Sequence, residues 1–478
     1  MTSSVQAAEP PRTLIEKIWA RHVVSEFGDG LSLVYVDRIL LHERGGGIAL
    51  VALSRAGRAV RDPNSVFATM DHVIDTFPGR TGASLVPGGA EFIDALRAGT
   101  AAHGIELFDL GDERQGVVHV MSPEQGIVLP GTTIVCNDSH TCTLGALSAL
   151  AWGVGTSDIE QVLATQTLVI RRPKTMRIRL DGTAGEGVTA KDLVLHALGT
   201  VGAAGANGYT IEFAGALVRN MSIEERLTLC NMAVEFAARS AIVAPDGKTF
   251  RYLASTAFAP KGDLWRRAIN DWRRLRSDTD AVFDKEIAID CGAVGVQVTW
   301  GTSPEDVLPI DGGRVPEPAQ CRDPVRARHA LSYMGLAPGL PIAGLPIDAA
   351  FIGSCTNGRL DDLRSAAEIL KGRRVAPGVR ALCVPGSTRV KRLAESEGLD
   401  KVFTDAGFEW RESGCSLCFS AGGESFSPGN RVITTTNRNF ENRQGRHVRS
   451  HLASPQTVAA AAVAGRIADA RTVREGSR

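Results

Sequence analysis

Short apolar runs, rich in β-branched residues, alternate along the chain with stretches whose apolar positions recur at helical spacing. Four runs predict buried strands and two stretches predict amphipathic helices: 132–136, 349–353, 379–384 and 431–436 for the strands, and 361–371 and 387–397 for the helices. Strands that alternate with helices in this way are typical of α/β architecture. An Ala-rich stretch, 458–470, predicts a closing helix.

The length of the chain and the position of a Pro-rich stretch predict three domains. At 478 residues the chain is several times the usual domain size. A Pro-rich stretch, 304–324, is typical of a linker. We therefore predict domains over residues 1–172, 173–303 and 304–478.

Residues that can carry chemistry follow directly on several predicted strands. Asp138 and His140 follow the first strand, Cys355 follows the second, and Asn437 and Arg438 follow the last. Sites in α/β proteins form beyond the carboxyl ends of strands. The sequence therefore predicts that these side chains belong to a functional site.

Composition and charge restrict the classes of function. Lys plus Arg and Asp plus Glu number 53 each, so no net positive field attracts nucleic acid. No segment approaches the roughly 18 consecutive apolar residues that a membrane span requires. The N-terminal residues show neither a signal peptide nor a transit peptide. We expect a cytoplasmic protein with a small-molecule ligand, no nucleic acid partner and no membrane association.

The nine cysteines are too sparse for a disulfide scaffold, but three of them form a pattern. Cys355 lies in Gly-Ser-Cys-Thr-Asn after a strand, and Cys415 and Cys418 form a Cys-x-x-Cys. Three thiolates suit an iron–sulfur cluster with one iron open to substrate, or zinc with a histidine as fourth ligand. Buried thiols without a metal are the third interpretation. Spacing alone leaves these three open.

Two Asp/His pairs provide candidate proton donors: Asp71 with His72, and Asp138 with His140. A carboxylate beside a histidine fixes its tautomer and raises its basicity, although such pairs also occur in ordinary surface turns. His119 lies in an apolar, strand-like run, where a core histidine is the simpler interpretation.

Arg438 and Arg443 lie in a polar segment that leaves the last strand. Guanidinium groups bind carboxylates through two hydrogen bonds, but surface arginines in a loop are the plain alternative. Glu212, in Tyr-Thr-Ile-Glu-Phe, can likewise be an ordinary strand carboxylate. Taken together, an open iron, imidazoles and arginines favour a hydro-lyase that acts on a 2-hydroxy diacid. The base for the carbon-bound proton lacks a candidate.

The motifs resemble the large subunits of bacterial isopropylmalate isomerases, in the aconitase superfamily. The similarity runs from about Ile15 to Thr472 and keeps the order and spacing of seven motifs: Ala-Thr-Met-Asp71-His72, Asn-Asp138-Ser-His140-Thr, Gly-Thr-Ser-Asp158, Leu-Ala-Thr-Gln-Thr, Ile-Gly-Ser-Cys355-Thr-Asn, Gly-Cys415-Ser-Leu-Cys418 and Asn-Arg438-Asn-Phe-Glu-Asn-Arg443. The resemblance implies the three-domain aconitase-like α/β/α fold without the fourth, swivelling domain. It also implies isomerisation of 2-isopropylmalate and 3-isopropylmalate through isopropylmaleate, in leucine biosynthesis.

The resemblance also implies roles for individual residues. It implies a [4Fe-4S] cluster on the three cysteines and a fourth iron that binds substrate. The remaining implied roles fall into three groups: proton handling and hydrogen bonding by Asp71, His72, His119, Asp138 and His140; an active-site carboxylate near the open iron at Glu212; and contacts to substrate or cluster by Ser139, Asn437, Arg438 and Arg443. A separate small subunit that carries the swivelling domain is expected to complete the site, in a heterodimer or heterotetramer.

Several positions depart from the family pattern. Ile48 stands where the family has a glutamine that reaches substrate. The other departures are Val73, Cys142, Leu144 and the segment 420–424 with Gly422 and Gly423. These changes keep open a paralogue that acts on another substituted malate, such as a methylmalate, a homocitrate-like acid or a specialised metabolite. A catalytically dead paralogue and a cluster-free RNA-binding regulator are the remaining alternatives.

Overall fold

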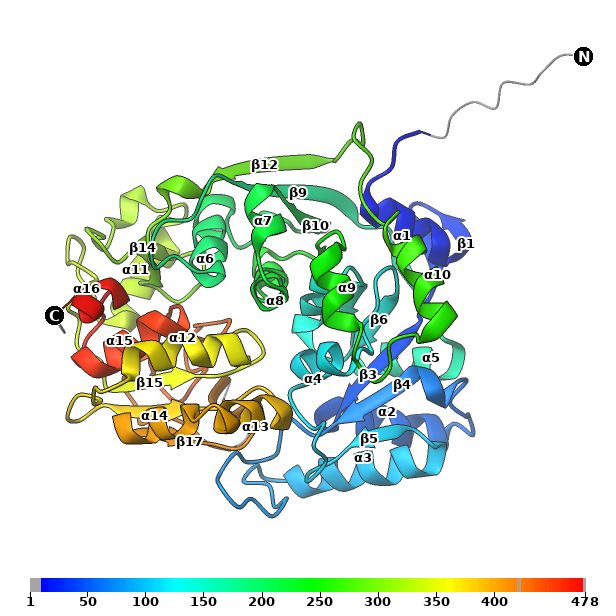
Figure 1. Ribbon diagram of the computed structural model, residues 1–478, viewed down its shortest axis with the longest axis horizontal. Coiled ribbons are helices and arrows are strands. Elements are labelled where there is room, and N and C mark those ends of the chain that lie inside the picture. The colour runs from blue at the N-terminus through cyan, green and yellow to red at the C-terminus, as the bar shows by residue number, and fades with distance from the viewer. Residues whose placement is uncertain (1–9, 419, 421–422, 476–478) are drawn as a thin grey trace, which may run out of the picture.

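The computed structural model describes residues 10–418, 420 and 423–475, with side chains to residue 473. Three parallel sheets with covering helices make up most of it (Figure 1). The expected α/β class is therefore confirmed. No helix within the described ranges is both long enough and apolar enough to cross a membrane.

The first sheet has five parallel strands, in the order β5 (Glu106–Phe108), β4 (Val66–Thr69), β3 (Arg38–His42), β6 (Thr133–Cys136) and β7 (Leu150–Gly153). Its three inner strands, β4, β3 and β6, are almost entirely buried, as parallel strands covered on both faces must be. The accompanying helices are α2 (Glu43–Arg55), α3 (Gly89–His103), α4 (Val118–Gln125) and α5 (Thr156–Thr165), whereas α1 (Leu14–His22) packs toward the second sheet.

Three glycines near the start of α2 let this helix pack unusually close to its neighbours. A Cβ on Gly45 would lie 2.2 Å from Nδ2 of Asn137, and one on Gly47 would lie 2.8 Å from the backbone nitrogen of Leu96 in α3. Glycine weakens the interior of a helix. The benefit of glycine at these positions is that α2 can approach its neighbours closely. The packing brings α2 against the loop that follows β6.

The second sheet has four parallel strands, in the order β11 (Ser240–Ile242), β10 (Tyr209–Ala214), β9 (Lys174–Asp181) and β12 (Lys285–Asp290). It lies across the top of the view in Figure 1 and shares one hydrophobic core with the first sheet. Its helices are α6 (Ala190–Val201), α7 (Ala216–Asn220), α8 (Ile223–Asn231), α9 (Gly247–Leu253) and α10 (Gly262–Trp272), and the 3₁₀ segment η3 (Met232–Phe236) follows α8.

The third sheet again has five parallel strands, in the order β17 (Phe408–Trp410), β16 (Arg380–Cys383), β15 (Ala349–Ile352), β18 (Arg431–Thr434) and β19 (Arg449–Leu452). Its helices are α11 (Pro324–Met334), α12 (Leu360–Leu370), α13 (Thr388–Ser396), α14 (Leu399–Ala406), α15 (Pro455–Ala464) and α16 (Ala470–Glu475). This half has its own core and faces the first sheet across the molecule (Figure 1).

Two small antiparallel sheets complete the fold: β1 (Val23–Gly28), β2 (Leu31–Tyr35) and β8 (Thr167–Arg171) form one, and β13 (Gln297–Thr299) and β14 (Val307–Pro309) form the other. The second lies partly inside the stretch expected to be a linker. A buried histidine, His451, connects β19 to it. Its Nδ1 donates to the carbonyl of Thr299 at 2.6 Å, and its Nε2 accepts from Nη1 of Arg431 at 2.9 Å. Burial, together with that guanidinium, lowers the pKa of His451 to about 3.

The four predicted strands and both predicted helices are confirmed, but two expectations need correction. The closing helix expected over 458–470 is two helices, α15 and α16, because Gly465 adopts φ +67° and ends α15. The strand-like run around His119 is the helix α4. The domain boundaries at residues 172 and 303 remain a prediction.

Candidate active site

A cavity of about 240 Å³ lies where the first and third sheets face each other. The first half of the chain contributes His42, Arg44, His72, Val117, Val118, His119, Asn137, Asp138, Ser139 and His140 to its lining, and the second half contributes Cys355, Cys415, Cys418, Asn437, Arg438 and Arg443. Residues that follow β3, β4, β6, β15 and β18 are thus brought together, as expected from the carboxyl ends of parallel strands.

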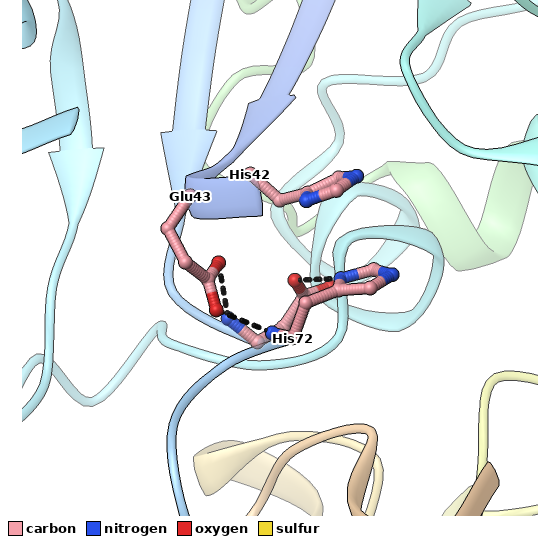
Figure 2. Close-up of side chains that lie close together, drawn as sticks. His42, Glu43 and His72 are labelled. Atoms are coloured by element: carbon pink, nitrogen blue, oxygen red, sulfur yellow. Dashed lines mark hydrogen bonds and ion pairs between the residues drawn. The ribbon is translucent and has the colours of Figure 1, made fainter. Parts of the chain in front are cut away.

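A buried carboxylate shapes the loop that carries Asp71 and His72. Both oxygens of Glu43 are used: Oε2 accepts from the backbone nitrogen of Asp71 at 3.0 Å, and Oε1 accepts from those of His72 and Val73 at 2.5 Å each (Figure 2). Asp71 accepts in turn from Nδ1 of His72 and from the backbone nitrogen of Val118, the latter at 2.8 Å. Asp71 is therefore fully buried behind His72 rather than in the cavity wall.

The same hydrogen bonds show whether the carboxylates of this loop are available to bind a metal ion. His42, Glu43, Asp71 and His72 place potential ligand atoms within 4.8 Å of one another. The two carboxylates are already occupied by backbone N–H groups and by the imidazole of His72. The group is a hydrogen-bonded support for His72, and it does not argue for a separate metal site.

Asp138 is the centre of the proton-handling cluster. Its Oδ2 lies 3.1 Å from Nε2 of His72, and its Oδ1 lies 3.0 Å from Nε2 of His119 and 2.7 Å from the backbone nitrogen of His140. Burial alone would raise the pKa of the Asp138 carboxyl, but hydrogen bonds from these histidines hold it well below its usual range. Asp138 is thus a fixed negative charge. His119 belongs to this cluster, so its interpretation as a plain core residue is corrected.

His72 lies between two carboxylates and stacks on a second histidine. Burial lowers the pKa of its imidazole, but the charges of Asp71 and Cys415 outweigh burial and raise it well above the usual value. The rings of His42 and His72 lie 3.8 Å apart at an interplanar angle of 13° (Figure 2). Burial and the nearby His72 lower the pKa of His42 to about 4. The structure therefore pairs a cationic imidazole with a neutral one.

A carboxylate that the sequence analysis missed, Glu235 in η3, joins His140 to Arg438. Its oxygens lie 2.9 Å from Nε2 of His140 and 2.8 and 3.0 Å from Nε of Arg438. Arg438 also donates to Oγ of Ser139 at 3.2 Å. The available sequence pattern was a pair of polar residues, Asn231 and Glu235, four apart in an otherwise apolar stretch.

The structure does not bring Glu212 to the cavity. Glu212 lies on β10 in the second sheet, where it accepts from Oγ of Ser277 at 2.6 Å and does not contribute to the lining. Glu235, rather than Glu212, is the carboxylate that contacts the lining residues His140 and Arg438. The expectation for Glu212 is corrected because its carboxylate is held by Ser277 and does not reach the cavity lining.

The three cysteines face one cavity, and each is 6% exposed. Nitrogen atoms surround their sulfurs: Nδ2 of Asn231 lies 3.1 Å from Sγ of Cys355, Nδ2 of Asn437 lies 3.6 Å from the same sulfur, and Nη2 of Arg443 lies 3.6 Å from Sγ of Cys418. Burial and the neighbouring Cys418 raise the pKa of Cys355 to about 12.

This arrangement fits a metal cluster, because three buried thiols that repel one another as anions require a bound cation to ionise. The surrounding N–H donors suit thiolate sulfurs, as they do around iron–sulfur centres. Asn231, Asn437 and Arg443 are therefore placed to support a cluster as well as to shape the cavity.

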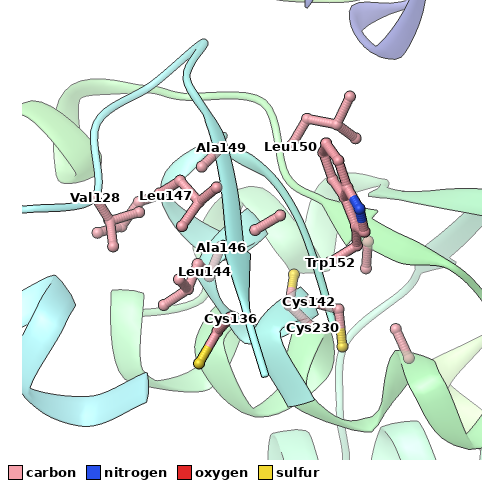
Figure 3. Close-up of a cluster of buried hydrophobic side chains, with 14 of the residues drawn as sticks. Val128, Cys136, Cys142, Leu144, Ala146, Leu147, Ala149, Leu150, Trp152 and Cys230 are labelled. Carbon is pink, nitrogen blue, oxygen red and sulfur yellow. The ribbon is translucent and has the colours of Figure 1, made fainter. Parts of the chain in front are cut away.

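Ile48, Val73, Cys142, Leu144 and Gly423 lie outside the cavity lining, whereas Arg44, in the segment before Ile48 that also departs from the family pattern, belongs to it. Ile48 is 47% exposed on α2, in a surface groove with Phe92, so it does not replace a substrate contact. Cys142 and Leu144 pack in the hydrophobic core (Figure 3). Val73 is buried, and Gly423 lies against Leu85; Gly422 is outside the described residues. The expected change of the pocket lining therefore rests on Arg44 and not on these other described residues.

Five further lining residues were not among the predicted site residues: His42, Arg44, Val117, Val118 and Asn137. His42 ends β3 and Asn137 directly follows β6, so the rule that identified Asp138 could also have found these two. Arg44 lies in the first turn of α2, and nothing in the local pattern separates it from a surface arginine.

Comparison with known proteins gives the class that this site indicates. The model of the aconitase family (aconitate hydratase) matches residues 16–465, and the chain belongs to that family. Members of this family are hydro-lyases that generally use an iron–sulfur cluster. Within it, the chain is 55% identical over 465 residues to the 3-isopropylmalate dehydratase large subunit 1 of Bradyrhizobium diazoefficiens, and the match covers 97% of each chain.

Proposed function

We propose that this chain is the catalytic large subunit of a 3-isopropylmalate dehydratase. The reaction interconverts 2-isopropylmalate and 3-isopropylmalate by removal and re-addition of water through isopropylmaleate. The observation that carries the proposal is one cavity in which three buried cysteines face the Asp138 histidine cluster and three arginines. The similarity to a curated large subunit over 97% of both chains supports the choice of substrate.

Cys355, Cys415 and Cys418 would hold a [4Fe-4S] cluster. When bound, such a cluster supplies an iron that acts as a Lewis acid toward the substrate hydroxyl and an adjacent carboxylate. The guanidinium groups of Arg438 and Arg443 would bind a substrate carboxylate, because planar donors match carboxylates. Glu235 fixes the direction of Arg438 through two hydrogen bonds of 2.8 and 3.0 Å.

The histidine cluster would manage the proton that accompanies the departing hydroxide. His72 holds a proton at each ring nitrogen, one toward Asp71 and one toward Asp138, at 3.1 Å for the latter. His119 is the second imidazole on Asp138. A proton held at Nε2 of either histidine lies at the cavity, where it can be delivered to the leaving oxygen.

The base for the carbon-bound proton would come from a small subunit. Asp138 is the carboxylate among the described lining residues, and three histidines already engage it. The curated relative is itself named a large subunit. We therefore infer a heterodimer or heterotetramer that acts on a small hydroxy diacid.

The test is co-expression with the small-subunit candidate from the same genome, anaerobic cluster reconstitution, and assay of isopropylmaleate hydration beside methyl- and benzyl-substituted maleates. We expect isopropylmaleate to give the highest kcat/KM. A higher kcat/KM for a methyl or benzyl analogue would replace the proposed substrate, and a fully loaded complex without turnover of any of them would contradict the proposal.

Cys355→Ser separates the role of the cluster from general damage to the fold. We expect this variant to lose its cluster, measured as bound iron and acid-labile sulfide, and at least about 1,000-fold in kcat, since the metal is the main electrophile. Cys383→Ala is the matched control, because Cys383 is equally buried on β16 but lies in the core of the third sheet. Full activity in Cys355→Ser would contradict the proposed cluster.

A further inference from the structure

A second polar cavity, of about 180 Å³, lies beside helix α4. Val118 and His119 of this helix line the active-site cavity, whereas Val120 and Glu124 line the second cavity. The other walls come from α8, α9 and α13 and from the turn before α12. The second cavity is therefore separate from the active site but shares a helix with it.

Four charged residues line this cavity: Glu124, Glu224, Arg359 and Arg389. No ion pair joins any carboxylate of this set to a guanidinium within the described part of the chain. Burial raises the pKa of Glu124 to about 7, and a 2.8 Å hydrogen bond from Oγ of Ser387 together with the two guanidiniums only partly offsets that effect. The two positive and two negative groups thus face a common space without neutralising one another directly.

Arg359 is the most constrained of the four, at 4% exposure. Its Nη1 donates to the carbonyl of Thr356 at 2.7 Å and its Nη2 to the carbonyl of Cys355 at 2.6 Å, while its Nε has no hydrogen-bond partner. A buried donor without a partner costs about 1–3 kcal/mol. The cavity therefore contains a cation with unused hydrogen-bonding capacity that also touches the backbone of a cluster cysteine.

Facing charges of both signs are complementary to a small zwitterion, because burying charges is unfavourable unless opposite charges neutralise them. The apolar part of the wall includes Leu360, Val390 and Leu393. Because a water molecule occupies about 30 Å³ in the liquid, the cavity has room for about six water-sized groups. This space suits a small amino acid and excludes a nucleotide or a folded peptide segment.

We propose that this cavity binds a free α-amino acid with an apolar side chain. Its ammonium group lies between Glu124 and Glu224, and its carboxylate lies between Arg359 and Arg389. Because Arg359 also holds the carbonyl of Cys355, binding changes the position of the loop that carries this cysteine. The site is therefore regulatory, and it changes turnover without occupying the active-site cavity.

The test is isothermal titration of the reconstituted complex with L-alanine, L-valine, L-leucine, L-methionine and L-phenylalanine. Two analogues with one charge each, 4-methylpentanoate and 3-methylbutylamine, serve as chemical controls. We expect saturable binding of at least one amino acid, and binding of both analogues at least about tenfold weaker, which equals ~1.4 kcal/mol. Absence of saturable binding by any amino acid, or equal binding of a one-charge analogue, would overturn the proposal.

Two variants locate the binding at this cavity. Glu224→Gln and Arg389→Gln each remove one charge from its wall, and neither residue lines the active site. We expect each to weaken amino-acid binding at least about tenfold and to leave turnover without amino acid unchanged. Arg392→Gln is the matched control, since Arg392 lies on the same helix and pairs with Glu113 at 2.5 Å.

The outcome is independent of which diacid the enzyme converts, because titration measures binding without turnover. Unchanged affinity in both cavity variants would place the binding elsewhere and refute the proposal. The regulatory step is tested by turnover at saturating amino acid. We expect at least about a twofold change in kcat in the wild type that disappears in Arg389→Gln, and an unchanged kcat on saturation would refute regulation.

Discussion

Glu235→Gln tests the most specific difference between the sequence analysis and the structure. The carboxylate of Glu235 accepts from His140 at 2.9 Å and from Arg438 at 2.8 and 3.0 Å, and it is 9% exposed. Oε1 contacts both His140 and Arg438, whereas Oε2 contacts Arg438 alone. Glutamine keeps the shape of this side chain, but its amide nitrogen, a donor, would replace the oxygen that lies 3.0 Å from Nε of Arg438. Arg438 therefore loses a charge-assisted hydrogen bond, and the negative charge beside it disappears.

The magnitude follows from these contacts. A hydrogen bond to a charged group contributes about 1.5–3 kcal/mol, so losing one of them should lower kcat/KM by about 10- to 150-fold. The reduction should appear in both KM and kcat, because Arg438 would bind the substrate carboxylate and His140 belongs to the Asp138 cluster. Cluster content should remain unchanged, since Glu235 makes no contact with a cysteine in the described residues.

The assay is hydration of isopropylmaleate by the anaerobically reconstituted complex, with iron measured for each variant. Glu212→Gln is the matched control: Glu212 is 5% exposed and accepts one hydrogen bond, from Ser277, outside the cavity. We expect it to keep kcat/KM within about twofold of the wild type. Wild-type kinetics in Glu235→Gln, or equal losses in both variants, would refute the assignment of the active-site carboxylate.

Three further predictions concern packing, pH and the cluster. Gly45→Ala should cost about 1–3 kcal/mol of stability and reduce kcat about tenfold, because its Cβ would lie 2.2 Å from Nδ2 of Asn137; thermal unfolding and kinetics measure the two effects. His451→Gln should reduce the loss of stability on acidification. His451, with a pKa of about 3, stays neutral in the folded protein, whereas in the unfolded chain it binds a proton near pH 6.5. Between these two pH values, the free energy of unfolding of the wild type therefore falls by ~1.4 kcal/mol per pH unit because of this group. Asn231→Ala removes the 3.1 Å contact to Sγ of Cys355 and should speed iron loss to a chelator about 10- to 100-fold.

Each of these variants has a control that makes a failure informative. Gly247→Ala introduces a methyl group that meets only the end of the Arg251 side chain, at 3.4 Å, and should be close to neutral. His329→Gln changes an exposed histidine and should leave the pH dependence of unfolding as in the wild type. Asn64→Ala changes an exposed amide and should not affect iron release. If a control variant changed stability, the pH dependence of unfolding or iron release as much as its test variant does, the structural explanation of that prediction would be contradicted.

Much of the site could be predicted because the residues that follow the strands of a parallel sheet lie together at one edge of that sheet. Asp138, Cys355 and Arg438 follow three strands, β6, β15 and β18, and two sheets that face each other bring these ends into one cavity. The strand pattern is a local property of the sequence, and the position of an active site relative to a parallel sheet is a general one. The strand pattern and this general rule together predict the site residues without knowledge of how the sheets pack.

The contributions of the second sheet could not be predicted in the same way. Glu212 and Glu235 are both buried glutamates in apolar stretches, and only the packing of α8 and η3 on the loop after β6 decides which one reaches Arg438. Whether Ile48 faces the cavity could not be predicted for the same reason, because the direction in which a helical residue points depends on how the helix packs. The glycines of α2 set that packing.

Helix and strand were confused where the apolar run was short. The residues around His119 give no clear periodicity, and short apolar runs are ambiguous between the two structures. The backbone nitrogen of Val118, the first residue of α4, donates to the buried carboxylate of Asp71 and so fixes the start of a helix there. Tertiary contacts thus decide a local conformation that the sequence pattern leaves open.

The hydrogen bonds of Glu43 to three successive backbone nitrogens have a consequence for how the enzyme is assembled and repaired. Apart from Glu235 and a 3.9 Å contact between Nδ1 of His72 and Sγ of Cys415, the described hydrogen-bond partners of the imidazoles of His72, His119 and His140 belong to residues 43–139, beside the first sheet. The cysteines that would hold the cluster belong to the other half of the chain. Under the proposed function, the residues that orient the proton donors would therefore stay in place when a cluster is lost or reloaded.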